Sequence, residues 1–519
     1  MSALIEKTCD VKYTPDILKI LGGDMLLYAR GYNLLEYLSC DIDVLERRSN
    51  LFHDTVSLPN LAEVLNDTVD RLDRISQMVQ MQNRVSEGDR DLYSIKELEL
   101  YFEVIDRLSA YYAQYKDKFI SKDYAAWLTE AEQIAQSEEY SRLKQGTALL
   151  IEKISKVKSI SVGFNMDASL TPYESGILSI NDKYIKSGQL VDRILRMDPS
   201  EDAHLLSMAP LVAPKKICNE REYEALNFSL YSALNKVFKK EIRQWEPEID
   251  KYLKNHLDFI LGALPDLKFI AGVSKIITDM RGMHLHLTKP QYFPKEEKRF
   301  CASNLYNPAL AIKLVETGVK SGVVKNSVTF DEDGRIFLLT GANSGGKTVY
   351  MRAIGLIQIM AQLGMPVPAD KLEISPADGI FVQLPLYSNR DSRLVEECEK
   401  TRAIFAEADE FSICIFDELF SSTDPSESIA LSAEVLKAMC HMGARGIYST
   451  HFHSLTDMVA QIHGELDPCR SKIDFLVAEV DEDSERRTYL ITRRPPDKKS
   501  YAKTITDKYG ISYERLTHI

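Results

Sequence analysis

The chain has 519 residues, of which 45% are hydrophobic and 27% are charged, and its formal net charge is −13. This length exceeds what one hydrophobic core usually supports, so we expect two or three domains. The negative charge argues against a protein that coats nucleic acid by bulk electrostatics, although it leaves room for a local basic groove. No window approaches the run of about eighteen apolar residues that a membrane span needs, so we expect no membrane partner.

The N-terminus and the cysteines indicate the compartment. The first residues, MSALIEK, include an early acid and no long apolar core, so they do not read as a secretory signal. The eight cysteines are scattered and form no Cys-x-x-Cys pair. This distribution is more typical of reduced thiols than of disulfides or a zinc site. We therefore expect a cytoplasmic protein.

Long helices are expected from the start of the chain to about Leu150, because apolar residues recur at steps of three and four. The clearest apolar stripes run from Leu61 to Ile75 and from Leu98 to Tyr115. We interpret both stripes as the core of a helical bundle rather than as a ligand surface. Asp43, with Glu46 three residues later, predicts a helix start.

The periodicity changes in the middle of the first part. Apolar and polar residues alternate near Ile160 and again near Leu178, with turn residues between them, which predicts a small β insertion near residues 157–185. Helical spacing resumes from about Tyr223 to Leu257, and Pro247 predicts a kink or a break within it.

Short apolar runs separated by Gly, Pro and Asn begin near Tyr292 to Asn307, and we place a domain boundary there. Residues 1–295 are then a mostly α-helical domain with the β insertion, and residues 296–519 are an α/β domain.

The stretch Gly341-Ala-Asn-Ser-Gly-Gly-Lys-Thr348 matches the phosphate-loop pattern of nucleotide-binding proteins. The apolar run Ile336–Leu339 before it reads as a buried strand, and helical spacing follows it. Backbone N–H groups of such a loop surround phosphates, the lysine reaches the β- and γ-phosphates, and the threonine holds Mg²⁺. The expected nucleotide-binding residues are Gly341, Ser344, Gly345, Gly346, Lys347 and Thr348. A glycine-rich turn without a ligand is the alternative, but strand, loop and helix all agree with a nucleotide site.

A second apolar run, Ser412–Phe416, ends in Asp417 and Glu418. In phosphate-loop ATPases the acid at such a strand end completes the Mg²⁺ shell, and the next acid can orient or deprotonate the attacking water. We therefore predict Asp417 as a metal-side acid and Glu418 as the catalytic base. The alternative is two acids that cap a buried strand for solubility.

Three further residues have two interpretations each. His451 ends a strand-like run and can donate a hydrogen bond to a γ-phosphate, or it is an ordinary surface histidine. His453 invites a metal interpretation, but two histidines without further ligands do not make a metal site. Ser392 precedes a helix, where it either caps that helix or also offers the helix N-terminus to an anion.

In combination these motifs resemble a known family. The segments Thr340–Arg352, Met365–Asp370, Ile415–Leu419 and Ser449–Phe452 resemble the ATPase domain of the MutS-type DNA mismatch-repair proteins. The resemblance spans about residues 307–501, and the helical first part is similar, more weakly, to the core and lever helices of the same family. It implies an ABC-like P-loop ATPase domain that follows a helical core and lever domain.

The resemblance also implies how the site works. It implies ATP and Mg²⁺ sites completed across a homodimer, with Asn343 and His451 near the phosphates as a binding and a catalytic residue. The resemblance also implies that Ser392 is the signature serine, which reaches the γ-phosphate bound by the second copy. A helical lever would link the ATP state to a DNA clamp, with the β insertion in the clamp position.

The chain departs from the family pattern at several positions. Ala342 and Ser344 stand where the loop usually has proline and methionine, and Arg393 stands where an aromatic residue follows the signature serine. Gly322–Asn326 has only aliphatic apolar residues where an aromatic residue that stacks on adenine is expected. Because the chain begins with the helical core, we expect no counterpart of the domain that carries the mismatch-wedging Phe-x-Glu.

We therefore expect an ATP-hydrolysing, dimeric protein of the MutS family that binds DNA, with a branched or otherwise structured duplex preferred over a simple mismatch. The alternative is an ATP-driven protein that acts on a ribosome or a protein partner. The net charge of −13 favours this alternative and the resemblance disfavours it.

Overall fold

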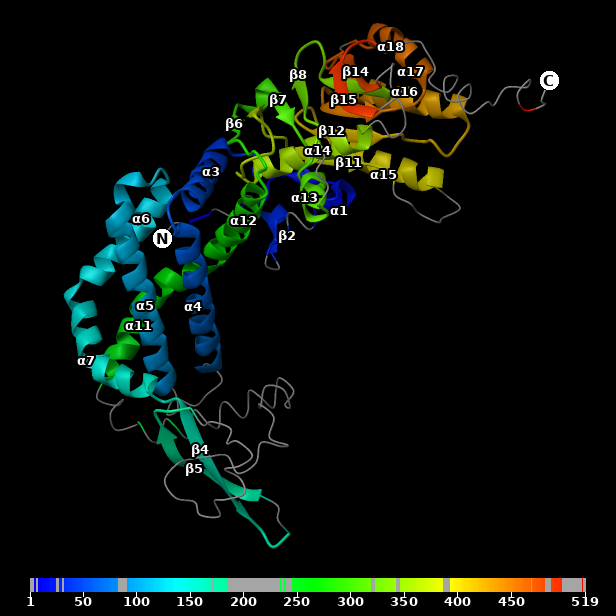
Figure 1. The fold of residues 1–519 in the computed structure, drawn as a ribbon. Coiled ribbons are helices and arrows are strands. Elements are labelled where there is room, and N and C mark those ends of the chain that lie inside the picture. The colour runs from blue at the N-terminus through cyan, green and yellow to red at the C-terminus, as the bar shows by residue number, and fades with distance from the viewer. Residues whose placement is uncertain are drawn as a thin grey trace. The chain divides into compact units, whose positions relative to one another are not determined.

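The computed structural model describes residues 4–5, 8–24, 28–29, 32–82, 91–169, 172–184, 234, 238, 245–318, 323–341, 346–385, 393–467, 469–480, 487–496 and 516. The chain forms two compact units, and Figure 1 labels many of their elements. The first consists mainly of residues 63–118 and 125–265, and the second of residues 2–62, 119–124 and 266–519. The predicted boundary at residues 295 and 296 lies within the second unit, and the division into two functional domains remains a proposal.

The first unit is a bundle of long helices, as the apolar spacing predicts. Its helices are α4 (Leu61–Gln82), α5 (Asp91–Tyr115), α6 (Lys122–Gln136), α7 (Glu138–Ser155) and α11 (Glu246–Gly262). The predicted stripes are buried, since Leu65, Leu72 and Leu98 are at most 1% exposed. Tyr101 of α5 meets Tyr252 of α11 edge to face, with ring centroids 5.7 Å apart. Helix α11, late in this unit, therefore packs into the same core as the early helices.

Pro247 marks the beginning of a helix. Helix α11 begins at Glu246 and carries Pro247 in its first turn, where a backbone N–H has no partner within the helix. The kink or break expected at this proline is thus a helix start. Most of the helical run expected before it, residues 223–244, lies outside the described residues.

The predicted β insertion is a hairpin. Strands β4 (Ser159–Met166) and β5 (Pro172–Asn181) pair antiparallel, with Ser159 opposite Asn181. The hairpin exposes apolar side chains, and Leu178 is 76% exposed. Its role as a clamp remains a proposal.

The second unit is built on a seven-stranded sheet. The strand order is β1 (Lys12–Tyr13), β11 (Gly379–Gln383), β12 (Ile413–Asp417), β13 (Arg445–Ser449), β9 (Ile336–Gly341), β14 (Ile473–Val480) and β15 (Arg487–Arg493). All neighbours are parallel except β14 and β15. Strands β11, β12 and β13 are buried at every position, as expected of a parallel sheet that is covered on both faces. The unit is therefore mixed α/β, as predicted.

Helices and a smaller sheet surround this core. The helices are α1 (Ile17–Leu21), α3 (Ile42–Ser57), α12 (Leu264–Gly282), α13 (Pro308–Glu316), α14 (Lys347–Gln362), α15 (Arg393–Glu407), α16 (Pro425–Met442), α17 (His453–Asp457) and α18 (Val459–Glu465). Helix α14 packs against β9, β11 and β12. The smaller, four-stranded sheet has the order β6 (Gln291–Tyr292), β10 (Lys371–Ile374), β7 (Phe300–Leu305) and β8 (Asn326–Phe330). None of the helices in the described residues has the length and apolar character to cross a membrane.

The start of α3 corrects one prediction. The helix begins at Ile42, and the cap is Asp41, whose carboxylate accepts hydrogen bonds from the backbone N–H groups of Asp43 and Val44 at 2.9 and 3.3 Å. The helix start predicted at Asp43 and Glu46 is therefore displaced, because Asp43 already lies in the first turn.

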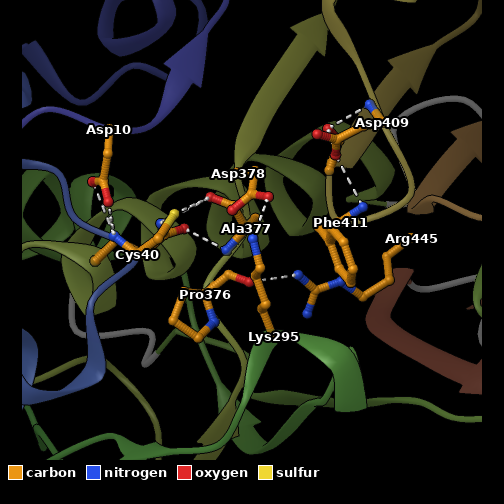
Figure 2. A network of polar contacts seen from close by, with 11 residues as sticks. Asp10, Cys40, Lys295, Pro376, Ala377, Asp378, Asp409, Phe411 and Arg445 are labelled. Atoms are coloured by element: carbon orange, nitrogen blue, oxygen red, sulfur yellow. Dashed lines mark hydrogen bonds and ion pairs between the residues drawn. The ribbon is translucent and has the colours of Figure 1, made fainter.

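A buried arginine joins the two sheets of the second unit. Arg445 of β13 is fully buried, and its guanidinium donates to the backbone carbonyls of Arg299, Ser375 and Pro376 at 2.8, 3.3 and 3.4 Å. Burial lowers the pKa of Arg445 to about 10. Figure 2 shows this guanidinium in the polar network around Asp378, which pairs with Lys295. Carbonyl dipoles thus compensate a charge that packs β13 against the ends of β7 and β10.

Candidate nucleotide-binding site

The phosphate-loop motif joins strand β9 to helix α14, as predicted. Two of its glycines have geometry that favours glycine. Gly341 has φ 122°, and a Cβ built there would lie 2.8 Å from the carbonyl oxygen of Ala478 on the neighbouring strand. Gly346 has φ 90° and immediately precedes α14. Residues 342–345, and with them the predicted Asn343, Ser344 and Gly345, lie outside the described residues.

Lys347 is held at the base of the loop. Its side chain is only 5% exposed, and its Nζ donates to the backbone carbonyl of Gly341 at 2.9 Å. The same Nζ lies 3.6 Å from Oε1 of Glu418. Burial lowers the pKa of Lys347, and the carboxylates of Glu418 and Asp417 act in the opposite direction. A buried ammonium group therefore faces the two predicted acids.

Asp417 lies between two hydroxyl groups. The Oγ1 of Thr348 donates to Oδ2 of Asp417 at 2.6 Å, and the Ser449 hydroxyl donates to Oδ1. The sheet register explains this contact, because Asp417 at the end of β12 lies opposite Ser449 at the end of β13. The structure thus brings together the two residues predicted on the Mg²⁺ side. It also brings Ser449 to Asp417. Ser449 is not among the predicted site residues, although it ends a predicted strand just as Asp417 does.

Glu418 follows directly in a sparsely populated backbone conformation. Its φ is 47°, and its N–H donates to the carbonyl of Ser449 at 3.1 Å. A non-glycine residue in the left-handed region costs roughly 1 kcal/mol or more, and such strain is concentrated at functional sites. Oε1 of Glu418 lies 3.8 Å from Nδ1 of His451, whose side chain is 40% exposed. The predicted base and the predicted γ-phosphate sensor are therefore neighbours.

The predicted signature serine, Ser392, lies outside the described residues, but the helix that follows it is described. Helix α15 begins at Arg393, whose Nε donates to Oε1 of Glu397 at 2.9 Å. The other oxygen of Glu397 accepts the N–H of Phe420 at 3.0 Å. The first turns of α15 are therefore tied to the loop that follows Glu418.

A cavity of about 690 Å³ opens beside these polar residues. Its lining includes the polar side chains of Lys347, Thr348, Asp417 and Glu418. Its lining also includes the largely apolar side chains of Leu305, Tyr306, Leu310, Leu314, Val323, Val324 and Tyr489. The cavity thus combines polar groups suited to phosphates with apolar surface suited to a base.

Tyr489 is an aromatic residue of this cavity that the motifs do not reveal. It lies in β15 with φ 58° and is 44% exposed. Its ring is close to the loop, because a Cβ on Gly346 would approach Cδ1 of Tyr489 to 3.3 Å. Asn326 holds this strand by donating to the carbonyl of Tyr489 at 3.1 Å and accepting the N–H of Ile491 at 2.7 Å. The position of Tyr489 at the cavity depends on the contacts between β15 and Asn326, which are far apart in the sequence, so the sequence alone does not reveal it.

The chain is similar to known proteins in this region. Residues 337–507 match the family described as MutS domain V. A DNA mismatch repair protein MutS from Lactobacillus delbrueckii subsp. bulgaricus is 34% identical over 175 residues, which are 31% of this chain and 20% of the relative. The protein of the same name from Bacillus subtilis is 28% identical over 313 residues, which are 58% of this chain and 32% of the relative.

The chain thus spans about a third or less of the length of these relatives. The matched region includes most of β9, helix α14, the Asp417–Glu418 pair and β13. The family match and the named relatives confirm the predicted resemblance to the MutS family in this region of the chain.

Proposed function

We propose that the chain binds ATP in the cavity beside Lys347 and hydrolyses it, and that the nucleotide state controls its binding to DNA. One observation carries this proposal: Thr348 contacts Asp417, Lys347 contacts Glu418, and all four line one cavity together with apolar side chains. We call these four residues the phosphate end of the cavity and its apolar lining residues the apolar end. Each of these four side chains has the chemistry that its place in phosphoryl transfer requires.

The phosphate end has a clear division of roles. The ammonium group of Lys347, now bonded to the Gly341 carbonyl, would turn to the β- and γ-phosphates, with the N–H groups of Gly341, Asn343, Ser344, Gly345 and Gly346 around them. Thr348 and Asp417 offer a hydroxyl and a carboxylate oxygen 2.6 Å apart, which suits a hard cation such as Mg²⁺. When bound, Mg²⁺ would neutralise charge on the phosphates.

Glu418 is the proposed general base. Its carboxylate already lies beside Lys347 and His451, so it can accept a proton from a water that attacks the γ-phosphate. His451 would donate a hydrogen bond to that phosphate. The loop after Glu418 is tied to α15 through Glu397, so the proposed base is connected to the start of α15.

The base of the nucleotide would occupy the apolar end. Val323 and Val324 lie in the segment where the family resemblance suggests an adenine contact, and they supply aliphatic surface. Tyr489, from strand β15 much later in the chain, supplies an aromatic face. This arrangement accounts for a base contact without an aromatic residue in the segment Gly322–Asn326.

The site is proposed to be completed by a second copy of the chain, as the resemblance implies. Ser392 would reach the γ-phosphate in the other copy, so the active form would be a homodimer of the ABC-like type. The helical unit would act as the lever and the β4–β5 hairpin as part of a clamp on structured DNA. The names of the relatives, DNA mismatch repair protein MutS, support DNA as the partner.

The test is ATP turnover by the full chain, measured alone and with matched, mismatched and branched duplexes, RNA, and ribosomes. We expect branched DNA to stimulate turnover most, with binding that weakens steeply as salt rises. The net charge of −13 favours the competing partner, a ribosome or a protein. Stimulation by ribosomes but by no DNA would overturn the DNA part of the proposal, and absence of ATP turnover under all conditions would overturn the enzymatic part.

A further inference from the structure

Three side chains that can bind a metal ion meet at the edge of the large sheet opposite to the phosphate loop. Cys440 near the end of α16, His463 of α18 and Cys469 before β14 each offer one ligand atom, and these atoms lie within 4.8 Å of one another. Cys440 is fully buried, and the other two residues are half-buried. They lie near the amino ends of β13 and β14, whereas Lys347 and Asp417 lie at the carboxyl ends of the parallel strands.

We propose that Cys440, His463 and Cys469 form a binding site for a thiophilic divalent cation, with Zn²⁺ as the favoured ion. This site is independent of the proposed ATP hydrolysis, because it shares no residue with the nucleotide cavity.

The spacing of the ligand atoms fits this ion. Zinc binds sulfur at about 2.3 Å and imidazole nitrogen at about 2.0 Å in tetrahedral geometry, so two ligand atoms of one ion lie about 3.5 to 4 Å apart. The observed limit of 4.8 Å therefore needs only side-chain adjustment. Water would complete the tetrahedron, since His463 and Cys469 are partly exposed.

The backbone around the cluster is already fixed. The N–H groups of Arg470 and Ser471 donate to the Cys440 carbonyl at 3.0 and 3.1 Å, which holds the Cys469 segment against the end of α16. The thiol of Cys469 donates to the Ser471 carbonyl at 3.3 Å. A site whose ligands are held in place by the fold loses less entropy when it binds an ion.

The charges of the cluster also suit a divalent cation. A metal ion binds cysteine as the thiolate and histidine as the neutral imidazole, so binding releases protons. Two thiolates, one neutral imidazole and one divalent ion sum to zero charge.

Metal binding would also change one hydrogen bond. Nε2 of His463 accepts the N–H of Ile473 at 2.9 Å. An ion on Nε2 would replace this bond, and an ion on Nδ1 would leave a proton on Nε2, which could then no longer accept it. In both cases the Ile473 amide changes its partner, so its NMR resonance should move when the ion binds.

The test uses the reduced full chain, stripped with a chelator and titrated with Co²⁺ without nucleotide. We expect one ion per chain that gives thiolate-to-cobalt charge-transfer absorption and is displaced by Zn²⁺. An ion bound by Thr348 and Asp417 would have oxygen ligands and would lack that band. A spectrum without the thiolate band, or no binding, would overturn the proposal.

Variants locate the site. Cys469→Ser should weaken Co²⁺ binding by more than about 100-fold, since loss of even an outer partner of a ligand costs about 10- to 100-fold. Cys440→Ser should do the same, and Cys469→Ser is the safer variant because Cys469 is only half-buried. The control is Cys398→Ser on α15, an exposed cysteine outside the cluster, which should bind normally. Equal affinity of Cys469→Ser and Cys398→Ser would contradict the assignment.

Discussion

The two groups of residues that line the proposed nucleotide cavity, the phosphate end and the apolar end, are built in different ways. The phosphate end takes its side chains from the ends of neighbouring strands and from the start of α14, and each of these residues belongs to a short motif. The apolar end takes Leu310, Val323 and Tyr489 from α13, from the segment before β8 and from β15. Recognition of charge requires fixed atoms at fixed places, whereas an apolar wall can come from any segments that pack together.

The largest expected effect is at the phosphate end, for Lys347→Ala. The variant removes the buried ammonium group and leaves Glu418 and Asp417 facing the phosphates, so ATP affinity should fall by at least about 100-fold. Equilibrium binding of ATP and of inorganic tripolyphosphate would measure this. The affinities for ATP and for tripolyphosphate should fall together.

The control for that variant is Lys313→Ala, which removes an exposed lysine of the nearby helix α13 and should bind both ligands normally. If Lys347→Ala kept its affinity for tripolyphosphate, the assignment of the phosphate end would be wrong.

A smaller and selective effect is expected at the apolar end, for Tyr489→Ala. Stacking of a base on an aromatic ring contributes about 1–3 kcal/mol, so ATP affinity should fall by roughly 5- to 150-fold. Affinity for tripolyphosphate should not change, because that ligand has no base. Tyr489→Phe keeps the ring and should bind ATP like the unaltered chain.

This pair of ligands tests the comparison directly. Equal losses of ATP and tripolyphosphate affinity in Tyr489→Ala would show that the ring acts on the loop at Gly346 and not on the base. The proposed difference between the two ends would then be wrong.

The smallest of the three effects is expected for Ser449→Ala. This variant removes the hydroxyl that donates to Asp417 and leaves Thr348 in place. The Mg²⁺ concentration for half-maximal turnover should rise by about 10-fold, as is common when a partner of a metal ligand is removed. A Mg²⁺ titration of the ATPase rate measures the shift, with Ser449→Thr as the conservative comparison. An unchanged Mg²⁺ requirement would remove Ser449 from the site.

The predicted residues of the phosphate end lie together in the structure for two reasons. A strand, a glycine-rich turn and a helix place Lys347 and Thr348, and the parallel sheet brings the end of β12, with Asp417 and Glu418, to the same edge as the end of β9. The roles of these residues, and those of Ser392 and His451, stay predictions. The mixed α/β fold and the resemblance of the ATPase region to the MutS family are confirmed.

The remaining features depend on pairing between distant segments. Tyr489 lines the cavity only because β15 pairs with β14 and Asn326 holds it, which no spacing in the sequence shows. The Cys440, His463 and Cys469 cluster was likewise hidden, since its members come from two helices and a connecting segment. The absence of a Cys-x-x-Cys pattern therefore does not exclude the proposed metal site.

The most direct test of the central claim is single-turnover hydrolysis by Glu418→Gln. This variant keeps the shape of the side chain but removes the proposed base, so it should bind ATP with Mg²⁺ and retain it, with hydrolysis slowed by about 100-fold or more. Glu434→Gln, at an exposed position of α16, should turn over normally. An unchanged hydrolysis rate in Glu418→Gln would contradict the account.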